Sequence, residues 1–273
     1  MFIKAPFQCL PFIKEIWYWT GVEAESLPWI LPSYEIEMVY HLQSPPLVFR
    51  NDTNLVTLPK LHWVGPQNLR WKIHSKEKLN LISVRFHAGA LWELMGQPIN
   101  EMVNHFPDIE ETSNSHFLQL KKFLSGINLS QANQIQTFES YLAEIIQQYK
   151  QKLYPIDTNI RFAFSELTDS NAKISEIEKK TGISRKQIER GMKKVYGFAP
   201  GEIRKIHRIL KMIRNPIHYK SERIETRLTD IAYEYGYVDQ SHLIHDFKLI
   251  TGYLPKEWFK NYKKMSYFYN SNV

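Results

Sequence analysis

Two short segments of the chain, residues 184–200 and 239–255, carry the side chains best suited to recognising another molecule. The first, SRKQIERGMKKVYGFAP, contains Glu189 and Arg190, and the second, DQSHLIHDFKLITGYLP, contains Gln240 and two histidines. An arginine can donate two hydrogen bonds to one guanine, a glutamine can pair with adenine, and a glutamate can accept from cytosine. These residue types would read the edges of bases if helices present them.

A metal site or a catalytic site has less support. His242 and His245 lie three residues apart, which could place two imidazoles on one helix face, but the sequence offers no third ligand near them. The single Cys9 excludes an internal disulfide and a cysteine-rich zinc site. The sequence contains no nucleophile–base pair, phosphate-binding glycine loop or nucleotide-binding motif. We therefore predict no enzymatic activity, no metal and no cofactor.

The elements that would present the candidate side chains follow from an internal repeat. At an offset of 55 residues the matched pairs are Ser184 and Asp239, Ile188 and Leu243, Met192 and Phe247, Gly197 and Gly252, and Pro200 and Pro255. Upstream the offset becomes 54, and Gly182 matches Gly236. Apolar residues four apart share one helix face, and serine and aspartate are good N-caps. Each copy therefore predicts a short helix, a glycine-containing turn and a second, capped helix.

This arrangement is a helix-turn-helix, whose second helix is shaped to lie in the major groove of DNA. The helices are predicted over residues 174–181, 185–195, 228–235 and 240–250, which gives units at 174–195 and 228–250. Between the units, Pro200 favours the start and Pro216 the end of a linker helix over residues 201–214. Its apolar stripe is Ile203, Ile206, Leu210 and Ile213. Such a linker is about 20 Å long, so it would hold the two units rigidly apart, facing successive major-groove segments.

Residues 157–263 resemble the DNA-binding domain of AraC/XylS transcriptional regulators. The strongest marks are LTDIAYEYGYVDQSHLIHDFKLITGYLPKEW and the earlier GISRKQIERGMKKVYGFAP. Two positions depart from the pattern. Glu178 stands where the second unit has the small Ala232, and Gly191 lies in mid-helix, where glycine costs about 1 kcal/mol relative to alanine. The resemblance implies a sequence-specific regulator that binds double-stranded promoter DNA.

The resemblance also implies which side chains meet DNA. Base contacts would come from the first half of each second helix, whereas basic residues such as Arg185 would meet phosphates, which position the protein without specifying sequence. The predicted set is Arg185, Lys186, Glu189, Arg190, Lys193, Lys194, Gln240, Ser241, His242, Ile244, His245 and Lys248. The alternative is that these are ordinary solvated helix residues, and the duplication favours contact with DNA.

The charge is unevenly divided along the chain. The formal net charge is +7; from residue 161 onward 22 Lys and Arg oppose 13 Asp and Glu, whereas the first 160 residues hold 13 and 15. A basic C-terminal half beside a near-neutral N-terminal half suggests a polyanionic partner at one end only. Charge alone does not distinguish this from a merely soluble basic surface.

The first 110 residues alternate apolar and polar positions in short stretches such as YEIEMVYHL and LNLISVRFH. With Pro, Gly and Asn breaks about every 8–12 residues, they favour a β-sandwich or barrel. Helices are expected over about 115–124 and 131–153. The apolar stripe of the second, from Ile135 to Tyr149, either packs on its own domain, which we expect, or forms a dimer seam.

This half resembles the cupin-like sensor domain of a subset of AraC-like regulators, in EIEMVYHL, WVGPQ and ISVRFHAGALWELMGQPINEMVN. Ala88 stands where that pattern has proline. The resemblance implies a small effector, but the sequence does not identify its ligand or its binding residues. Trp63, Trp71 and Trp92 are pocket candidates, although large aromatic residues more often build a core. The histidines of this half, His41, His62, His74 and His87, lack the closely spaced His/Glu set of a cupin metal site.

Together these patterns predict an α+β chain of two domains. Residues 1–154 form a cupin-like β-barrel or sandwich with flanking helices, which senses a signal or dimerises, and residues 155–273 form the all-α DNA-binding domain. Charges and prolines interrupt the apolar N-terminal segment, unlike a signal peptide, and no uncharged apolar stretch of about 18 residues occurs. We therefore expect a cytoplasmic protein without membrane contact.

The expected partner is promoter DNA, while RNA polymerase, a small effector and a second copy of the chain stay open. A competing hypothesis is a cupin-type metal-dependent enzyme that carries a DNA-binding appendage. A third, a DNA-repair methyl acceptor, needs reactive zinc-held cysteines, which Cys9 alone does not supply. The target sequence, activation or repression, and the oligomeric state do not follow from the sequence.

Overall fold

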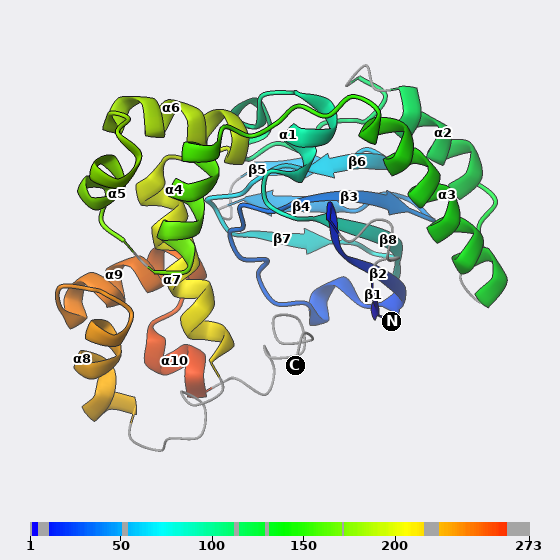
Figure 1. Cartoon of the computed structure of the whole chain (residues 1–273). Coiled ribbons are helices and arrows are strands. Elements are labelled where there is room, and N and C mark those ends of the chain that lie inside the picture. The colour runs from blue at the N-terminus through cyan, green and yellow to red at the C-terminus, as the bar shows by residue number, and fades with distance from the viewer. Residues whose placement is uncertain are drawn as a thin grey trace.

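The computed structural model describes residues 2–4, 11–50, 54–111, 115–128, 131–170, 172–215 and 224–260. Cys9 and Pro216 lie outside these ranges. Figure 1 shows strands gathered in the N-terminal half and a helical C-terminal half beside them, which confirms the α+β prediction. Among the described residues, no helix is both long and apolar enough to cross a membrane.

The N-terminal half is built on two antiparallel sheets. The described strands form a five-stranded sheet in the order β1-β2-β8-β3-β6 and a three-stranded sheet in the order β5-β4-β7. Their bounds are β1 Phe2–Lys4, β2 Ile13–Val22, β3 Ile36–His41, β4 Leu47–Arg50, β5 Asn54–Thr57, β6 Leu61–Val64, β7 Trp71–His74 and β8 Leu79–Phe86. Core residues from both sheets meet in one cluster, so the two sheets form a sandwich.

Strand β8 shows how this half is layered, because successive residues of a strand point to opposite faces. Leu81 joins the core between the two sheets, whereas Ile82, Val84 and Phe86 join a second core on the other face of the large sheet. That second core is covered by α1 (Ala90–Met95), α2 (Ser115–Leu124) and α3 (Ala132–Lys150). The apolar stripe of α3 is buried there, so it packs on its own domain rather than forming a dimer seam.

The C-terminal half consists of helices around one core that includes both predicted units and the linker. Their bounds are α4 Thr158–Thr168, α5 Ile174–Thr181, α6 Arg185–Tyr196, α7 Pro200–Arg214, α8 Ile224–Glu234, α9 Gln240–Thr251 and α10 Pro255–Lys260. Helices α5, α6, α7 and α9 match the predicted ranges within one residue, whereas α8 begins four residues earlier than predicted. Helices α4 and α10 were not predicted.

One position of the linker helix differs from its prediction. Ile203, Ile206 and Ile213 are buried in the core as expected, but Ile209 also joins them. Leu210, which the stripe placed inside, is only partly buried and faces a cavity next to the sandwich. The helix therefore has one face toward its own domain and another toward the N-terminal half.

Candidate nucleic-acid interface and cavity

Helix α6, the second helix of the first unit, has both ends held by side chains and backbone. The Ser184 hydroxyl accepts from the backbone N–H of Gln187, whose side chain accepts in return from the Ser184 N–H at 2.9 Å. Glu178 accepts from the backbone N–H of Arg185 at 2.7 Å. A carboxylate at a helix N-terminus is stabilising because unpaired N–H groups gather there. The residue that broke the repeat is therefore a further cap for this helix.

Helix α9 of the second unit is capped in the matching way. Asp239 accepts from the backbone N–H of His242 at 2.8 Å. Both second helices then end on the glycines that the repeat aligned, Gly197 at φ +85° and Gly252 at φ +83°. A left-handed residue after the last turn favours glycine because it has no Cβ. The repeat found in the sequence is thus a repeat of backbone conformation.

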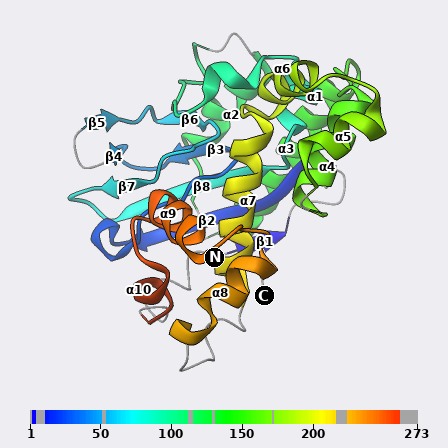
Figure 2. The same cartoon turned by 90° about the vertical axis from the view of Figure 1, so that its left-hand side faces the viewer.

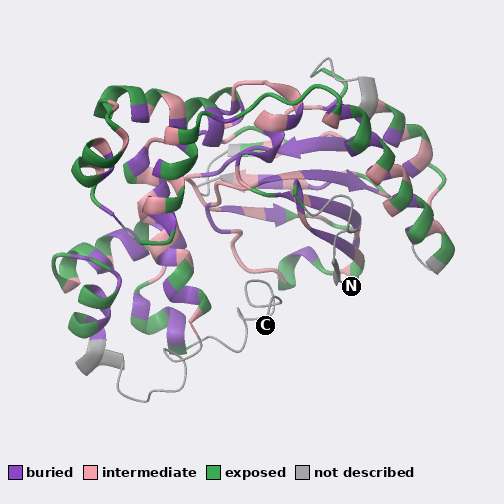
Figure 3. Ribbon diagram, viewed as in Figure 1, coloured by how far each residue is buried: buried purple, intermediate pink, exposed green. Residues whose placement is uncertain are grey.

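The predicted DNA-contacting residues all lie at the surface. Exposed members are Arg185, Lys186, Arg190, Lys193, Lys194, Ser241, His242, His245 and Lys248, and partly buried members are Glu189, Gln240 and Ile244. Figures 1 and 2 show the two units at opposite ends of α7, and Figure 3 shows exposed residues on the outward sides of their helices. The structure therefore leaves these side chains open to a partner.

Several of these side chains have neighbours within the protein. Arg185 donates to Glu189 at 2.9 Å. His242 and His245 approach the buried carboxylate of Asp246 at 3.6 and 3.5 Å. Within the part of the chain that is described, no group of three or more His, Cys, Asp or Glu residues is arranged to hold a metal ion.

The mid-helix glycine of α6 allows another helix to approach. A Cβ on Gly191 would lie 2.4 Å from Cδ1 of the buried Ile160 in α4. At the repeat offset of 55, the matching residue of α9 is Asp246, which lies 3.7 Å from Lys205 in α7. The first unit is therefore supported by α4 at the position where the second unit is supported by the linker.

One loop of the sandwich reaches both units. We call residues 65–70, between β6 and β7, the bridging loop. A Cβ on Gly197 would lie 3.0 Å from Pro66, and one on Gly252 would lie 2.7 Å from the guanidinium carbon of Arg70. Asn68 donates to Glu202, in the first turn of α7, at 3.2 Å. The C-terminal ends of both second helices thus rest against the same loop.

Other contacts join the two halves around this loop. The hydroxyl of Tyr34 is 2.9 Å from Nδ1 of His207 in α7. Arg161 donates to Glu93 of α1 at 2.6 Å. The ammonium of Lys194, a predicted phosphate contact, lies 4.7 Å from the centre of the Trp92 ring. Trp92, a pocket candidate in the sequence, therefore lies in the contact between the halves.

Comparison with known families agrees with the geometry of the C-terminal half. Residues 177–261 match a family model described as a helix-turn-helix domain. The chain is an AraC-type DNA-binding transcriptional regulator. Residues 3–108 of the regulator match a model described as a domain of unknown function (DUF6597).

The regulator is also similar to solved structures of ToxT from Vibrio cholerae. An apo form of ToxT that carries a single substitution is 13% identical over 94% of this chain and 99% of that chain, with a TM-score of 0.44. ToxT bound to (E)-4-(8-methylnaphthalen-1-yl)but-3-enoic acid is 12% identical over 90% and 97%, with a TM-score of 0.46. ToxT bound to an unsaturated fatty acid is 12% identical over 94% and 92%, with a TM-score of 0.42. No curated protein matches the regulator at a significant level.

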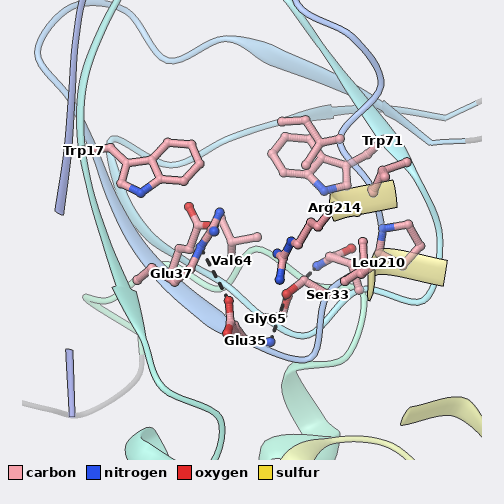
Figure 4. Close-up of a pocket in the computed structure, with 14 residues that line it drawn as sticks. Trp17, Ser33, Glu35, Glu37, Val64, Gly65, Trp71, Leu210 and Arg214 are labelled. Atoms are coloured by element: carbon pink, nitrogen blue, oxygen red, sulfur yellow. Dashed lines mark hydrogen bonds and ion pairs between the residues drawn. The ribbon is translucent and has the colours of Figure 1, made fainter. Parts of the chain in front are cut away.

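Two cavities of the regulator share part of their walls. The inner cavity lies between the two sheets and includes His41 and His62, and the interdomain cavity continues to Leu210 and Arg214 of α7. Figure 4 shows Arg214 extending from the linker helix toward Ser33 and Glu35. The shared walls are Trp17, Ile30, Glu37, Val64, Trp71 and Arg85. The two cavities are therefore adjacent, and the interdomain cavity reaches the linker helix.

A buried charge cluster borders both cavities, because Arg85 and Glu37 line each of them. Arg85 donates to Glu15 at 2.7 Å and to Glu37 at 2.9 and 2.6 Å, and Glu35 lies at 3.8 Å. Burial opposes the charge of Arg85, but Glu37, Glu35 and Glu15 outweigh it and raise its pKa. Burial likewise opposes the charge of Glu35, but Arg85 and Lys14 lower its pKa. Arg85 and Glu35 therefore stay ionised near neutral pH.

Two histidines of the inner cavity are neutral. The rings of His41 and His62 stack with centres 5.3 Å apart. Burial lowers the pKa of His41 to about 3 and that of His62 to about 4. Because a neutral imidazole carries one proton, His62 Nδ1 must donate its N–H to the carbonyl of Pro59, 2.8 Å away. Its Nε2 is therefore an acceptor.

Of the tryptophans predicted as pocket candidates, one lines the cavities and another lies in a core. Trp71 lines both cavities. Trp63 is fully buried in the core beneath the helices, where it contacts Phe86 and Phe117. The charge cluster around Arg85 was not found from the sequence. Its one sequence signal is the two-residue spacing of Glu35 and Glu37, which places both on one face of the chain where it is extended.

Proposed function

We propose that this AraC-type regulator reads promoter DNA through α6 and α9, and that a small effector in its cavities controls how the two units dock on the sandwich. The observation that supports DNA reading most is the pair of matched, capped helices with exposed polar residues at equivalent positions. In α6 the base contacts are Lys186, Glu189 and Arg190. In α9 they are Gln240, Ser241, Ile244 and His245, with the remaining predicted residues on phosphates.

The experiment is a selection of bound sequences from random DNA, repeated with Arg190→Ala and Gln240→Ala. Each variant should relax the preference at a distinct position, because a bidentate pair contributes about 1–3 kcal/mol of discrimination. Lys122→Ala is a matched control, since Lys122 is exposed on α2 in the other domain. A uniform loss of affinity at all positions would show that the residue contacts phosphate instead.

The bridging loop offers a route from the cavities to the DNA-reading helices. Gly65 and Gln67 line the interdomain cavity, and Pro66 and Arg70 of the same loop touch the C-caps of α6 and α9. Gly65 cannot be replaced by a residue with a side chain unless the backbone shifts, because a Cβ there would lie 1.9 Å from the carbonyl oxygen of Met102. An effector that binds one docked arrangement more tightly than another would shift the population between them.

Docking through the loop is tested with Arg70→Ala. If the contact restrains the second unit, the variant should change DNA affinity about 5- to 150-fold, the usual range of coupling between sites. The thermal unfolding of the sandwich serves as a check that the fold is intact. Unchanged affinity together with unchanged sequence preference would exclude a role of this contact in DNA binding.

We also propose that the regulator acts in the cytoplasm, with RNA polymerase and a second copy of the chain as further partners. Dimerisation is tested by sedimentation of the full chain without DNA and with DNA fragments that carry one or two selected sites. A complex with two chains that forms on DNA with one site would support a preformed dimer.

A further inference from the structure

The inner cavity contains polar atoms that make no hydrogen bond within the described structure. They are Nε2 of His41, Nε2 of His62 and Nε1 of Trp71. These three residues are 3%, 1% and 6% exposed. A buried polar atom without a partner costs about 1–3 kcal/mol, and most such atoms in native proteins are paired. Three such atoms lie around one cavity, where a bound molecule would supply the missing bonds.

The unpaired atoms of His62 and Trp71 require different partners, because one accepts a hydrogen bond and the other donates one. His62 offers an acceptor at Nε2, because its Nδ1 hydrogen is already donated to Pro59. The indole N–H of Trp71 can only donate. A molecule that satisfies both must carry a donor, such as N–H or O–H, and an acceptor.

The charged residues of the cavity are already paired with one another. Arg85 binds the carboxylates of Glu15 and Glu37, and the second oxygen of Glu37 accepts from Ser83 at 2.7 Å. A charged ligand would have to break these pairs or lie unpaired among apolar walls, which is costly in a buried site. The inner cavity therefore favours an uncharged molecule.

Planar aromatic rings form much of the lining of the inner cavity. The rings of Trp17, Trp19 and Trp71 line it together with the stacked imidazoles of His41 and His62. Aromatic rings pack best against other aromatic rings in offset or edge-to-face arrangements. Ligand sites of this kind are mostly apolar, with a few polar groups that fix orientation.

We propose that the inner cavity binds an uncharged, flat heteroaromatic molecule with at least one N–H or O–H donor and one acceptor. The donor binds Nε2 of His62 and the acceptor binds the indole N–H of Trp71. This assignment rests on the proposed function, because it names the chemical class of the effector that would bind this cavity.

The test is isothermal titration calorimetry of the full chain with three probes. Indazole has one N–H and one acceptor nitrogen, 1-methylindazole lacks the donor, and indazole-3-carboxylate adds a negative charge. Indazole should bind. 1-Methylindazole should bind about 2- to 12-fold more weakly because it loses one buried hydrogen bond, and indazole-3-carboxylate should bind at least about 10-fold more weakly because its charge must be buried.

Two variants locate the binding. Trp71→Phe keeps an aromatic wall but removes the N–H, and should weaken indazole binding about 2- to 12-fold. Trp63→Phe removes an equally buried indole N–H from the other core of the same domain, and should leave the affinity unchanged. Circular dichroism of both variants checks that they fold.

Tighter binding of the carboxylate, equal effects of the two variants, or no indazole binding up to millimolar concentration would each overturn the assignment. DNA affinity measured with and without indazole separates this inference from the proposed function. If indazole binds at Trp71 and DNA affinity does not change, the ligand class stands and effector control fails. If DNA affinity responds to a charged molecule in this cavity instead, effector control stands and the ligand class is wrong.

Discussion

Acid should destabilise the regulator through the two neutral histidines of the inner cavity. Burial lowers the pKa of His41 from 6.5 to about 3 and that of His62 from 6.5 to about 4. The unfolded chain therefore binds protons near pH 6.5 that the folded chain does not bind. Stability rises with pH wherever the unfolded state holds more protons. The contribution is complete above about pH 6.5 and is lost as the pH falls toward 4.

The magnitude follows from the size of the pKa gap. One unit of pH within the window costs about 1.4 kcal/mol for each histidine. At about pH 5, each of the two histidines has lowered the free energy of unfolding by about 2 kcal/mol relative to its value at about pH 7, and the pair by about 4 kcal/mol. Lys60 adds to the effect of burial and lowers the pKa of His41 further. Pro59, Asp108 and Glu37 raise the pKa of His62, but they only partly offset the effect of burial.

The assay is urea unfolding at a series of pH values between about 7 and 5. His62→Gln should remove about half of the contribution of the pair. His207 also has a pKa lowered by burial and adds to the slope of every variant, so the difference between variants isolates His62. An identical slope in the parent and in His62→Gln would refute the reasoning.

Three further predictions concern the fold that positions the reading helices. Arg85→Met should lower the free energy of unfolding by about 3–5 kcal/mol, because it leaves buried carboxylates without a counter-charge; a loss under about 1 kcal/mol in urea unfolding would contradict this. Gly191→Ala gains about 1 kcal/mol of helix propensity but overlaps Ile160, which costs about 1–3 kcal/mol, so thermal unfolding should show no gain; a stabilisation of about 1 kcal/mol would disprove the close contact. Asp239→Ala removes the N-cap of α9 and should cost about 1 kcal/mol, with faster amide exchange in the first turn of α9; unchanged exchange there would be inconsistent with the cap.

The C-terminal fold could be predicted because its signals are local and occur twice. The N-caps Ser184 and Asp239 and the C-cap glycines Gly197 and Gly252 mark the ends of α6 and α9 in the sequence. Each acts within about one turn of its own helix, so it needs no knowledge of distant contacts. The apolar residues between them supply the period that identifies the buried face.

The features that could not be predicted from the sequence depend on contacts between residues far apart in the chain. Gly191 weakens its helix locally, and its purpose emerges only when α4 lies against it through Ile160. Glu37 and Arg85 meet because strands β3 and β8 pair with these two residues opposite each other. Nothing local to the bridging loop shows that Pro66 and Arg70 reach both units. Pairing and docking of this kind are set by tertiary structure rather than by spacing.

The central claim is that one chain reads DNA with two matched helices at once. Hydroxyl-radical footprinting on a selected site tests it most directly. The parent regulator should protect two segments on one face of the duplex, about 10 base pairs apart, the distance between successive major-groove segments. Arg190→Ala should weaken protection of one segment first and Gln240→Ala that of the other. A single protected segment, or equal weakening of both segments by either variant, would contradict the account.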